Sequence, residues 1–247
     1  MVKISRLDEL GSSWGQSPYL LNAASDLFWS EADRKEFFRR IARTVSDQWL
    51  RVLLNGRYVF HKELLQEAPL SVRDGTLIVS ADKLESYLNQ SATIVVRGAH
   101  SYLSEAHQFS EVLEAKFKCP ISCNLYAAKC NSVGFKEHFD THHIIVVQLH
   151  GSKTWRVSPT VEQQSSKFVS ISKQVVPPGT PRLVFTLQSG DGLYLPRGCW
   201  HCASSGPEGS THLSFGIHIP TKGEQLLNEA RLSAATPYYS ADLYGFP

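Results

Sequence analysis

Three residues of this chain could together hold a metal ion: His138, Asp140 and His201. In an extended strand, side chains at positions i and i+2 point to the same face, so His138 can offer an imidazole nitrogen and Asp140 a carboxylate oxygen to one ion. His201 would add a second imidazole from a distant strand. Two histidines and one carboxylate on one face of an octahedron leave the opposite positions open, which suits non-haem Fe(II) with a bidentate organic acid and dioxygen.

Neighbouring residues allow two other metal sites. His138 and His142 stand four apart, as in zinc-binding helices, but Phe139 occupies the place of the metalloprotease glutamate. Cys199 and Cys202 form a C-x-x-C pattern that is typical of zinc or redox sites. A structural zinc site needs a second pair of ligands, and the proline and glycine just before Cys199 indicate a loop turn rather than the helix start of a redox motif. The iron site is therefore the favoured hypothesis.

Other histidines lie near these motifs. His142, His143 and His150 could be alternative ligands, groups that face a substrate, or histidines on the surface of a strand. Packing or hydrogen bonding is favoured for His212 and His218, which fall on the last expected strand.

The length and composition predict one good-sized domain, or a domain with a small appendage: 247 residues, 42% hydrophobic and 19% charged. The formal net charge is +2 and no run of Lys and Arg is dense, so bulk charge does not predict a nucleic-acid partner. The first residues lack the apolar stretch of an export signal, and the longest aliphatic run, 144–147, is too short to span a bilayer. We therefore expect a cytoplasmic protein without a membrane partner. Five cysteines, an odd number at irregular spacings, argue against a disulfide framework.

The first half of the chain reads as helices mixed with short strands. Ser30 can cap a helix whose apolar residues recur at helical spacing, which predicts an amphipathic helix over 30–46. Asn55-Gly56 is a signal for a two-residue hairpin turn. The expected elements are strands at 49–53 and 58–60 around that turn, a helix after Ser80, a buried strand at 93–96 and a helix over 102–117.

Beyond Pro120 the pattern changes to short strands separated by Gly, Pro, Ser or Asn. Gly151-Ser152 reads as a turn that folds the strand of Lys153 back beside the strand that follows Asp140. The expected strands are 122–127, 143–150, 153–157, 167–171, 182–186, 193–195 and 212–219. Such regular spacing of short strands predicts an antiparallel barrel or jelly roll, the architecture that includes cupins.

The expected fold class is thus mainly β with flanking helices: a double-stranded β-helix, or jelly roll, preceded by N-terminal helices. We divide the chain into an N-terminal helical and strand region, 1–118, that packs on the barrel, the barrel core with the metal site, 119–220, and a short C-terminal helix and aromatic tail, 221–247. These parts are expected to form one structural domain.

Across 14–220 the chain resembles the JmjC-domain, cupin-fold oxygenases, and within them the ribosomal-oxygenase-like branch. The motifs that carry the resemblance are, in order, Asn124-Leu-Tyr126, Gly134-Phe-Lys-Glu-His138-Phe-Asp140-Thr-His-His, Val147-Gln-Leu-His-Gly151-Ser-Lys153-Thr-Trp155, Gly190-Asp-Gly-Leu-Tyr-Leu-Pro196-Arg-Gly, His201 and His212-Leu-Ser214. In combination and in this order they are highly specific. The family uses Fe(II), 2-oxoglutarate and O2, so the resemblance implies His138, Asp140 and His201 as the iron ligands.

The resemblance also implies residues that bind 2-oxoglutarate. Lys153 would be the cation for the distal carboxylate, and an ammonium buried beside a barrel interior does need an anionic partner. Asn124, Tyr126 and Ser214 would be polar groups of the same pocket. Ordinary buried hydrogen bonding is the other interpretation of these three side chains.

The implied function is a dioxygenase that hydroxylates an amino-acid side chain of a protein or peptide, with release of succinate and CO2. Ribosomal oxygenases usually continue past the barrel with a dimerisation region and a winged helix, whereas few residues follow Pro220 here. The expected substrate is therefore either a ribosomal protein or a natural-product precursor peptide, and a homodimer is a possible assembly.

Two alternatives stay open. One is a non-catalytic or differently metallated cupin that acts as a ligand- or partner-binding module. The other is a cupin isomerase or a dioxygenase without cosubstrate, but such sites usually carry a His-x-His pair, and Asp140 stands where the second histidine would be. Candidates for lining a substrate groove are Arg57, His61, His100, His142, Tyr194 and Arg197.

Overall fold

The computed structural model describes residues 3–5, 7–24, 29–44, 49–54, 57–67, 77–130, 132, 134–162, 173–220, 222–223 and 225–226. The strands are β1 Lys3–Ser5, β2 Tyr19–Ala24, β3 Leu50–Leu54, β4 Arg57–Tyr58, β5 Leu65–Glu67, β6 Leu77–Val79, β7 Thr93–Arg97, β8 Ile121–Ala128, β9 His143–Val161, β10 Leu183–Leu187, β11 Asp191–Leu195 and β12 Cys199–Ile217. The helices are α1 Glu31–Thr44, α2 His61–Leu64, α3 Ala81–Asn89 and α4 Ser104–Phe117, with 3-10 turns η1 Leu7–Ser13 and η3 Ala99–Ser101.

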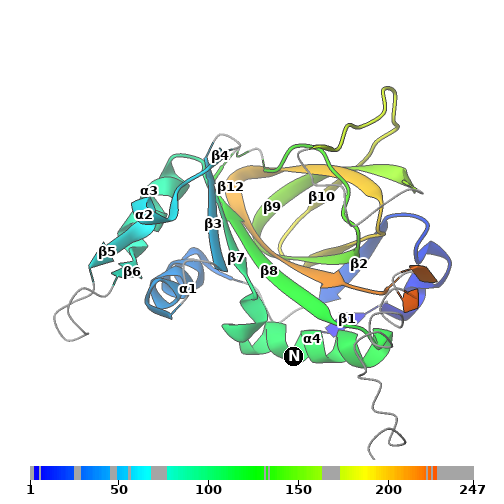
Figure 1. Ribbon diagram of the computed structural model, residues 1–247, viewed down its shortest axis with the longest axis horizontal. Helices are drawn as coiled ribbons and strands as arrows, with labels where there is room; N and C mark the ends of the chain where they lie inside the picture. The colour runs from blue at the N-terminus through cyan, green and yellow to red at the C-terminus, as the bar shows by residue number, and fades with distance from the viewer. Residues whose placement is uncertain are drawn as a thin grey trace, which may run out of the picture.

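The two longest strands, β9 and β12, form the frame of a jelly roll. They pair antiparallel along almost their whole length, and β8 pairs with the second half of β12. β11 pairs with the first half of β9, and β10 pairs with its second half. These strands curve around a common interior in Figure 1. The structure therefore confirms the predicted fold class, a mainly β jelly roll with flanking helices.

The path of β9 differs from the prediction. The sequence predicted two strands, 143–150 and 153–157, folded back on each other at Gly151-Ser152, and this is wrong because one strand runs through both. Gly151 has φ +63°, so the strand bends there without reversing, and it stays paired with β12 on both sides of the bend. β12 begins at Cys199, much earlier than the predicted 212, and its pairing with β9 shifts register between Ser205 and Ser210.

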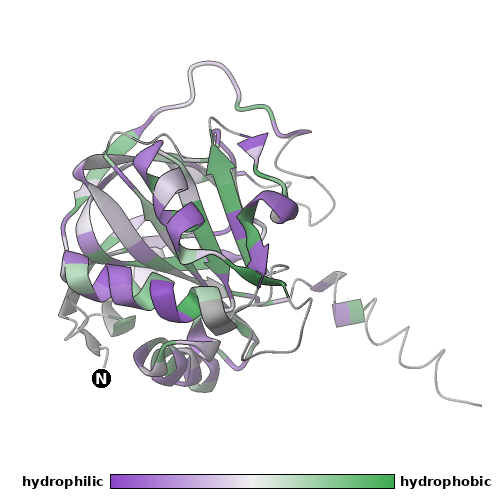
Figure 2. Cartoon of the chain, turned by 90° about the vertical axis from the view of Figure 1, so that its left-hand side faces the viewer, coloured by the Kyte–Doolittle hydropathy of each residue, from purple (hydrophilic) through white to green (hydrophobic). Residues whose placement is uncertain are grey.

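The N-terminal half extends the barrel sheet. β7 pairs with β8, β3 pairs with β7, and β4 pairs with β3, so the described part of the sheet has the order β1-β2-β11-β9-β12-β8-β7-β3-β4. Successive side chains on these strands point to opposite faces of the sheet. One of the two faces packs with α1, α3 and α4 around a large apolar core. Figure 2 shows hydrophobic residues along the strands behind helices whose outer surfaces are largely hydrophilic.

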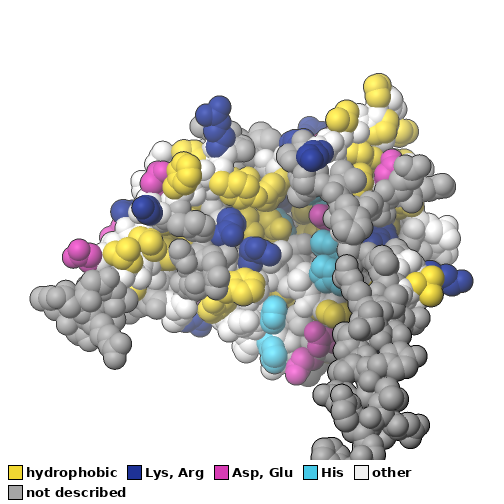
Figure 3. Space-filling view, in the orientation of Figure 1, with side chains coloured by type: hydrophobic (Ala, Val, Ile, Leu, Met, Phe, Trp, Pro, Cys, Tyr) yellow, Lys and Arg dark blue, Asp and Glu magenta, His cyan; other side chains and the backbone are white. Residues whose placement is uncertain are grey.

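One side of the molecule carries charged and apolar side chains together. Figure 3 shows Lys and Arg side chains beside hydrophobic ones near the centre of that view.

The predicted helices begin at the expected caps. At α1, the Asp33 carboxylate accepts from the Ser30 backbone N–H at 2.8 Å and the Asp33 N–H donates to Ser30 Oγ at 3.2 Å, a reciprocal cap. Ser80 Oγ caps α3 by accepting from the Lys83 N–H at 3.4 Å.

Several expectations fall on residues outside the described ranges. These are the Asn55-Gly56 turn, the strand at 167–171, most of the helix at 224–232 and the aromatic tail. The domain boundaries at 118 and 220 stay predictions. Within the described ranges, no helix is long and apolar enough to cross a membrane. All five cysteines are free thiols, as the sequence predicted.

Candidate metal centre

Residues 134–140 bring two of the three candidate ligands against the start of β12. The Gly134 N–H donates to Ala203 O at 3.2 Å, and the Gly198 N–H donates to Asp140 O at 2.8 Å. Between them, His138 and His201 exchange two backbone hydrogen bonds, at 3.0 and 2.7 Å, in an isolated antiparallel bridge. The histidine–aspartate pair is therefore extended, and backbone bonds hold it beside His201.

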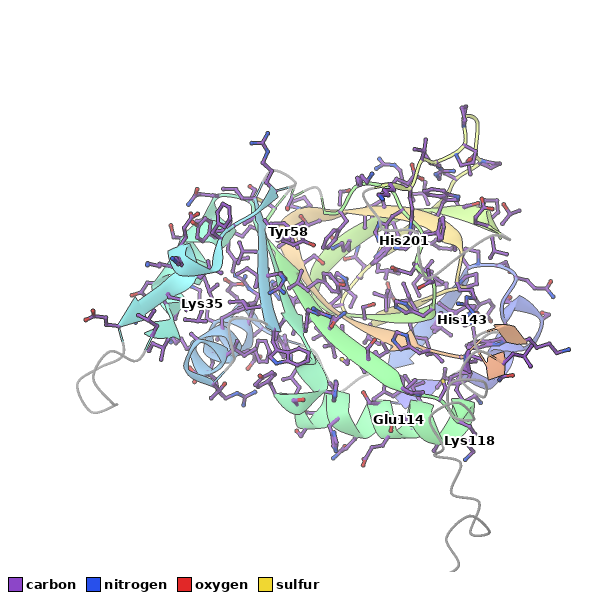
Figure 4. The ribbon with its side chains drawn as sticks, in the orientation of Figure 1. Lys35, Tyr58, Glu114, Lys118, His143 and His201 are labelled. Carbon is purple, nitrogen blue, oxygen red and sulfur yellow. The ribbon has the colours of Figure 1, made fainter. Side chains whose placement is uncertain are left out.

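The three side chains converge. His138, Asp140 and His201 offer ligand atoms that all lie within 4.8 Å of one another, and His201 Nε2 is 3.6 Å from Asp140 Oδ2. Figure 4 shows His201 within the barrel. His138 and His201 are buried and Asp140 is partly exposed, so one side of the cluster opens to the pocket.

Backbone carbonyls fix the orientation of both imidazole rings. His138 Nδ1 lies 2.8 Å from Lys136 O, and His201 Nδ1 lies 2.9 Å from Cys199 O. A carbonyl can only accept, so each Nδ1 carries the proton and each Nε2 keeps its lone pair for a metal. Burial, and then the neighbouring His138, lower the pKa of His201 to about 4, which keeps this ring neutral. Two imidazoles and a carboxylate fit a divalent metal with open coordination positions.

A pocket of about 520 Å³, a volume that includes some space open to solvent, adjoins the three ligands. Its walls come from the segment before the ligand pair and from β7, β8, β9 and β12. The lining residues are Thr93, Tyr126, Gly134, Phe135, His138, Asp140, Ile144, Lys153, Trp155, His201, Cys202, Ala203, His212 and Ser214.

The pocket contains several polar groups that have no partner among the residues that the structure describes. Lys153 is buried, with its ammonium 5.8 Å from the centre of the Trp155 ring, and none of the ion pairs among the described residues includes it. Burial lowers the pKa of Lys153 to about 8. Trp155 Nε1 and His212 Nδ1 are also buried without a hydrogen-bond partner among the described residues. Unpaired donors around a buried cation are costly unless an anion binds there, so this part of the pocket fits a carboxylate.

The three polar residues implied by the resemblance are placed differently from one another. Tyr126 and Ser214 line the pocket, and Tyr126 stacks on His212 with ring centres 4.9 Å apart. Burial raises the pKa of Tyr126, which keeps the phenol protonated. Asn124 shares the strand face of Tyr126 and is in register with Ser214, but it is not among the pocket-lining residues.

The other histidines have structural contacts instead. His143 is buried, stacks on Trp14 at 4.5 Å, and lies 2.9 Å from the Tyr194 hydroxyl. Burial lowers its pKa to about 4. His150 Nδ1 donates to Trp29 O at 2.9 Å on the surface beside α1. His142 stacks on His218, the residue that follows β12, at 4.4 Å between ring centres.

The proposed groove set needs correction. Tyr194 is fully buried and its hydroxyl accepts from the Gly15 N–H at 2.8 Å, so it cannot line an exposed groove. Arg57 is exposed on β4, but alternation along this strand places it on the face opposite to Tyr58. Arg197 is half-buried and donates to the carbonyls of Thr141 and Ile219.

Sequence reasoning missed two residues of this region. Packing or hydrogen bonding was expected for His212, and the structure shows that it also lines the pocket beside Lys153. Gln174 was not singled out, yet its side-chain amide accepts from the Phe139 N–H at 2.8 Å and donates to Phe139 O at 3.1 Å. His212 carried a signal, since it is two residues before Ser214 on the same strand face. Gln174 carried none, because its contact joins it to a residue 35 positions away in the sequence.

The cysteine pair does not form a rival site. Positions 199 and 202 of β12 are three apart, so their side chains point to opposite faces of the strand. Within the described residues, the cluster that could hold a metal ion consists of His138, Asp140 and His201.

The fold and the site together define a cupin-type barrel with a two-histidine, one-carboxylate centre. The family model for the JmjC domain matches residues 98–225, which identifies the family of this barrel. The chain belongs to the JmjC-domain family, and it is ribosomal-oxygenase-like.

Relatives with curated descriptions share this domain. "Ribosomal oxygenase 2" of Mus musculus is 35% identical over 129 residues, which cover 52% of this chain and 26% of the mouse protein. "Bifunctional lysine-specific demethylase and histidyl-hydroxylase NO66" of Culex quinquefasciatus is 30% identical over 145 residues, which cover 58% of this chain and 22% of that protein. The chain thus spans about a quarter of the length of these relatives.

Solved structures share the fold. The Escherichia coli ribosomal oxygenase YcfD superposes with a TM-score of 0.55 at 17% identity, covering 100% of this chain and 62% of that one. A structure of YcfD in complex with cobalt and 2-oxoglutarate superposes with a TM-score of 0.53 at 16% identity, covering 100% of this chain and 61% of that one. At these identities the likeness establishes the fold.

Proposed function

We propose that this protein is an Fe(II)- and 2-oxoglutarate-dependent dioxygenase that hydroxylates an amino-acid side chain of a protein or peptide. The observation that carries the proposal is the pocket in which His138, Asp140 and His201 converge and to which Lys153 also contributes. A metal centre and a separate buried cation in one pocket match a cosubstrate with an oxo-acid end and a distal carboxylate.

The proposed ligands of Fe(II) are His138, Asp140 and His201. Lys153 would pair with the distal carboxylate of 2-oxoglutarate, and the unpartnered nitrogens of Trp155 and His212 lie in the same pocket. Tyr126 and Ser214 offer hydroxyls there, while Asn124 would act from the adjoining register position. The complex of YcfD with cobalt and 2-oxoglutarate supports this cofactor assignment by analogy.

Bound Fe(II), 2-oxoglutarate and O2 would supply an oxidative decarboxylation that gives succinate, CO2 and a hydroxylated carbon. The protein would contribute position and exclusion of water. Lys153 neutralises the distal carboxylate of the cosubstrate, and the rings of Phe135 and Trp155 with Ile144 make much of the wall apolar. The carbonyls of Lys136 and Cys199 hold both imidazoles in the tautomer that a metal requires.

The proposed substrate is a protein or peptide, with a ribosomal protein as the first choice. The support is the likeness to ribosomal oxygenase 2 and to the histidyl-hydroxylase NO66. A natural-product precursor peptide is the other candidate. The cytoplasmic location and the homodimer stay predictions.

An anaerobic titration of the Fe(II)-loaded protein with 2-oxoglutarate tests the proposal. We expect a metal-to-ligand charge-transfer band in the visible for the wild type. Lys153→Ala should require far more 2-oxoglutarate to develop the same band, whereas Lys62→Ala, an exposed lysine of α2, should behave as the wild type.

Oxygen-dependent succinate formation then separates an enzyme from a binding module. A band with succinate release supports the dioxygenase. The absence of any band from protein that has bound iron would refute it and would favour the non-catalytic or differently metallated cupin.

A further inference from the structure

The sheet extension beside the pocket has an exposed surface that takes no part in the proposed binding of metal or cosubstrate. Residues in register on neighbouring strands point to the same face of a sheet. Arg97 on β7 is in register with Asn124 on β8, which is in register with Ser214 on β12, a pocket-lining residue. Arg97 therefore lies on the pocket side of the sheet, two strands from Ser214 in the wall of the pocket.

Aromatic side chains accompany Arg97. Its guanidinium lies 5.8 Å from the centre of the Trp49 ring, a cation–π contact that orients it. Tyr58 on β4 is in register with Leu53, which is in register with Thr93, another pocket-lining residue. We call the surface formed by Trp49, Tyr58 and Arg97 the Arg97 shelf.

The Arg97 shelf is exposed and has the composition of a binding surface. Tyr58 is 61% exposed, Trp49 is 42% exposed, and Arg97 is also exposed. Arginine, tryptophan and tyrosine are the residues that most often dominate binding energy at protein interfaces. Figure 4 shows Tyr58 at the edge of the extension that adjoins the barrel.

The positive charge of the Arg97 shelf has no ion-pair partner in the described part of the chain. Among the described residues, the ion pairs leave Arg97 without a carboxylate partner. The Asp140 carboxylate belongs to the proposed metal centre. Burial and then Asp140 raise the pKa of Tyr126, whereas Arg97 lowers it, so the positive charge of the shelf reaches the pocket wall.

Resting on the proposed function, we propose that the Arg97 shelf binds an acidic residue of the substrate polypeptide and so determines which segment is hydroxylated. An Asp or Glu side chain would pair with the Arg97 guanidinium, and apolar parts of the neighbouring residues would pack on Trp49 and Tyr58. The substrate class is thus a peptide segment with a carboxylate close to its target residue.

The geometry also limits the spacing. Two strand separations amount to about 10 Å, and an extended peptide advances about 3.3 Å per residue. The acidic residue should therefore lie about two to four positions from the hydroxylated one, once the reach of both side chains is allowed for.

The test is selection from a random peptide library on protein loaded with Mn(II) and 2-oxoglutarate without oxygen. Selected peptides are identified by mass spectrometry, and each is remade with its acidic residue changed to Asn or Gln. Fluorescence anisotropy then gives the affinities for wild type, Arg97→Glu and Arg97→Lys. Arg57→Glu is the matched control, because it makes the same charge change on the opposite face of the extension.

We expect Asp and Glu to be enriched in peptides selected by the wild type and by Arg57→Glu. Neutralising the acid should weaken binding about fivefold, the effect of an exposed ion pair. Arg97→Glu should select Lys and Arg instead, and Arg97→Lys should keep the acidic preference. Failure to select peptides, no acidic enrichment, or an enrichment that Arg97→Glu leaves unchanged would overturn the proposal.

These results are independent of the proposed chemistry. If the charge-transfer band forms but acidic peptides are not preferred, the Arg97 shelf is wrong and the dioxygenase stands. If acidic peptides bind but no band forms with Fe(II), the shelf stands and the dioxygenase fails. Where turnover occurs, mass spectrometry of the product checks the spacing.

Discussion

Lys153 is a buried cation, and no anionic side chain among the described residues pairs with it. Burial lowers its pKa from 10.5 to about 8, so the unfolded chain binds the proton more tightly. Stability therefore rises between about pH 8 and 10.5, and below about pH 8 the folded protein bears the full cost of the buried charge. A group retained at such a cost is typical of a binding site.

Replacing Lys153 should stabilise the protein while weakening cosubstrate binding. Lys153→Met fills a similar volume without a charge, so the free energy of unfolding without 2-oxoglutarate should rise by about 1–3 kcal/mol at pH 7. Urea unfolding measures it, and Lys62→Met on the surface should change little. A less stable Lys153→Met protein would mean that the lysine has a stabilising partner.

The pH dependence of 2-oxoglutarate binding should follow the same lysine. The protonated form pairs with the carboxylate, so affinity should be full at neutral pH and fall as the pH rises above about 8. Bound 2-oxoglutarate is a dianion and favours the charged lysine. At saturating cosubstrate, Lys153 should therefore lose its proton at a higher pH than in the free protein. Anaerobic titrations across pH measure this. Lys153→Arg, if it binds, should lose the alkaline decline, since arginine stays charged.

At the scale of elements, the segment after 173 supports the metal ligands from outside the barrel. Gln174 makes both hydrogen bonds to the backbone of Phe139, the residue between two proposed ligands. Arg182 at the end of this segment pairs with Glu137. The segment and the ligand pair are therefore linked at two points.

Changing Gln174 should loosen the metal centre. Gln174→Ala removes two buried hydrogen bonds, each worth about 1 kcal/mol, and leaves Phe139 backbone groups unpaired. We expect roughly tenfold weaker Co(II) binding, a typical effect of losing an outer partner of a ligand. Cobalt absorption titrations measure it. Gln174→Glu keeps the acceptor for the Phe139 N–H and should be intermediate, so equal loss in both variants would contradict this role.

The bend in β9 depends on Gly151. A Cβ on this residue would lie 2.2 Å from Gly209 O, in addition to the positive φ of +63°. Gly179 has φ +72° but no atom within 4 Å of its Cβ position. Gly179→Ala therefore measures the free-energy cost of the positive φ alone. Gly151→Ala should lower the free energy of unfolding by at least about 2 kcal/mol more than Gly179→Ala. Similar losses in chemical denaturation would show that β9 can relax at the bend.

At the scale of the whole molecule, one large sheet joins the N-terminal region to the barrel. β7, from the N-terminal region, pairs with β8 of the barrel in five register positions, from Thr93 with Ala128 to Arg97 with Asn124. The large apolar core includes residues from α1, α3, α4 and the barrel strands. We propose that the predicted regions 1–118 and 119–220 form one cooperative unit.

This proposal predicts one unfolding transition. Circular dichroism and tryptophan fluorescence should give the same midpoint, because Trp14 and Trp49 report on the N-terminal region and Trp155 and Trp200 on the barrel. A fragment beginning at 119 should fail to fold, since β8 would lose β7 and the apolar face under α4 would be exposed. Separate transitions, or a folded fragment that binds metal, would contradict it.

The sequence by itself determined the local parts of this protein. Alternating and helical patterns predicted most elements, and the spacing of His138 and Asp140 placed both side chains on one face, because each signal depends on a few adjacent residues. The order of motifs also indicated the family. These features need no knowledge of distant contacts.

Only the tertiary structure decided which distant groups meet. His201 lies beside His138 while His143 stacks on Trp14, although the sequence offered both as possible ligands. The continuous path of β9 through Gly151 and the hydrogen bonding of Gln174 to Phe139 likewise depend on pairing with residues far along the chain. Such contacts are set by strand register and packing of the whole barrel, which no local pattern encodes.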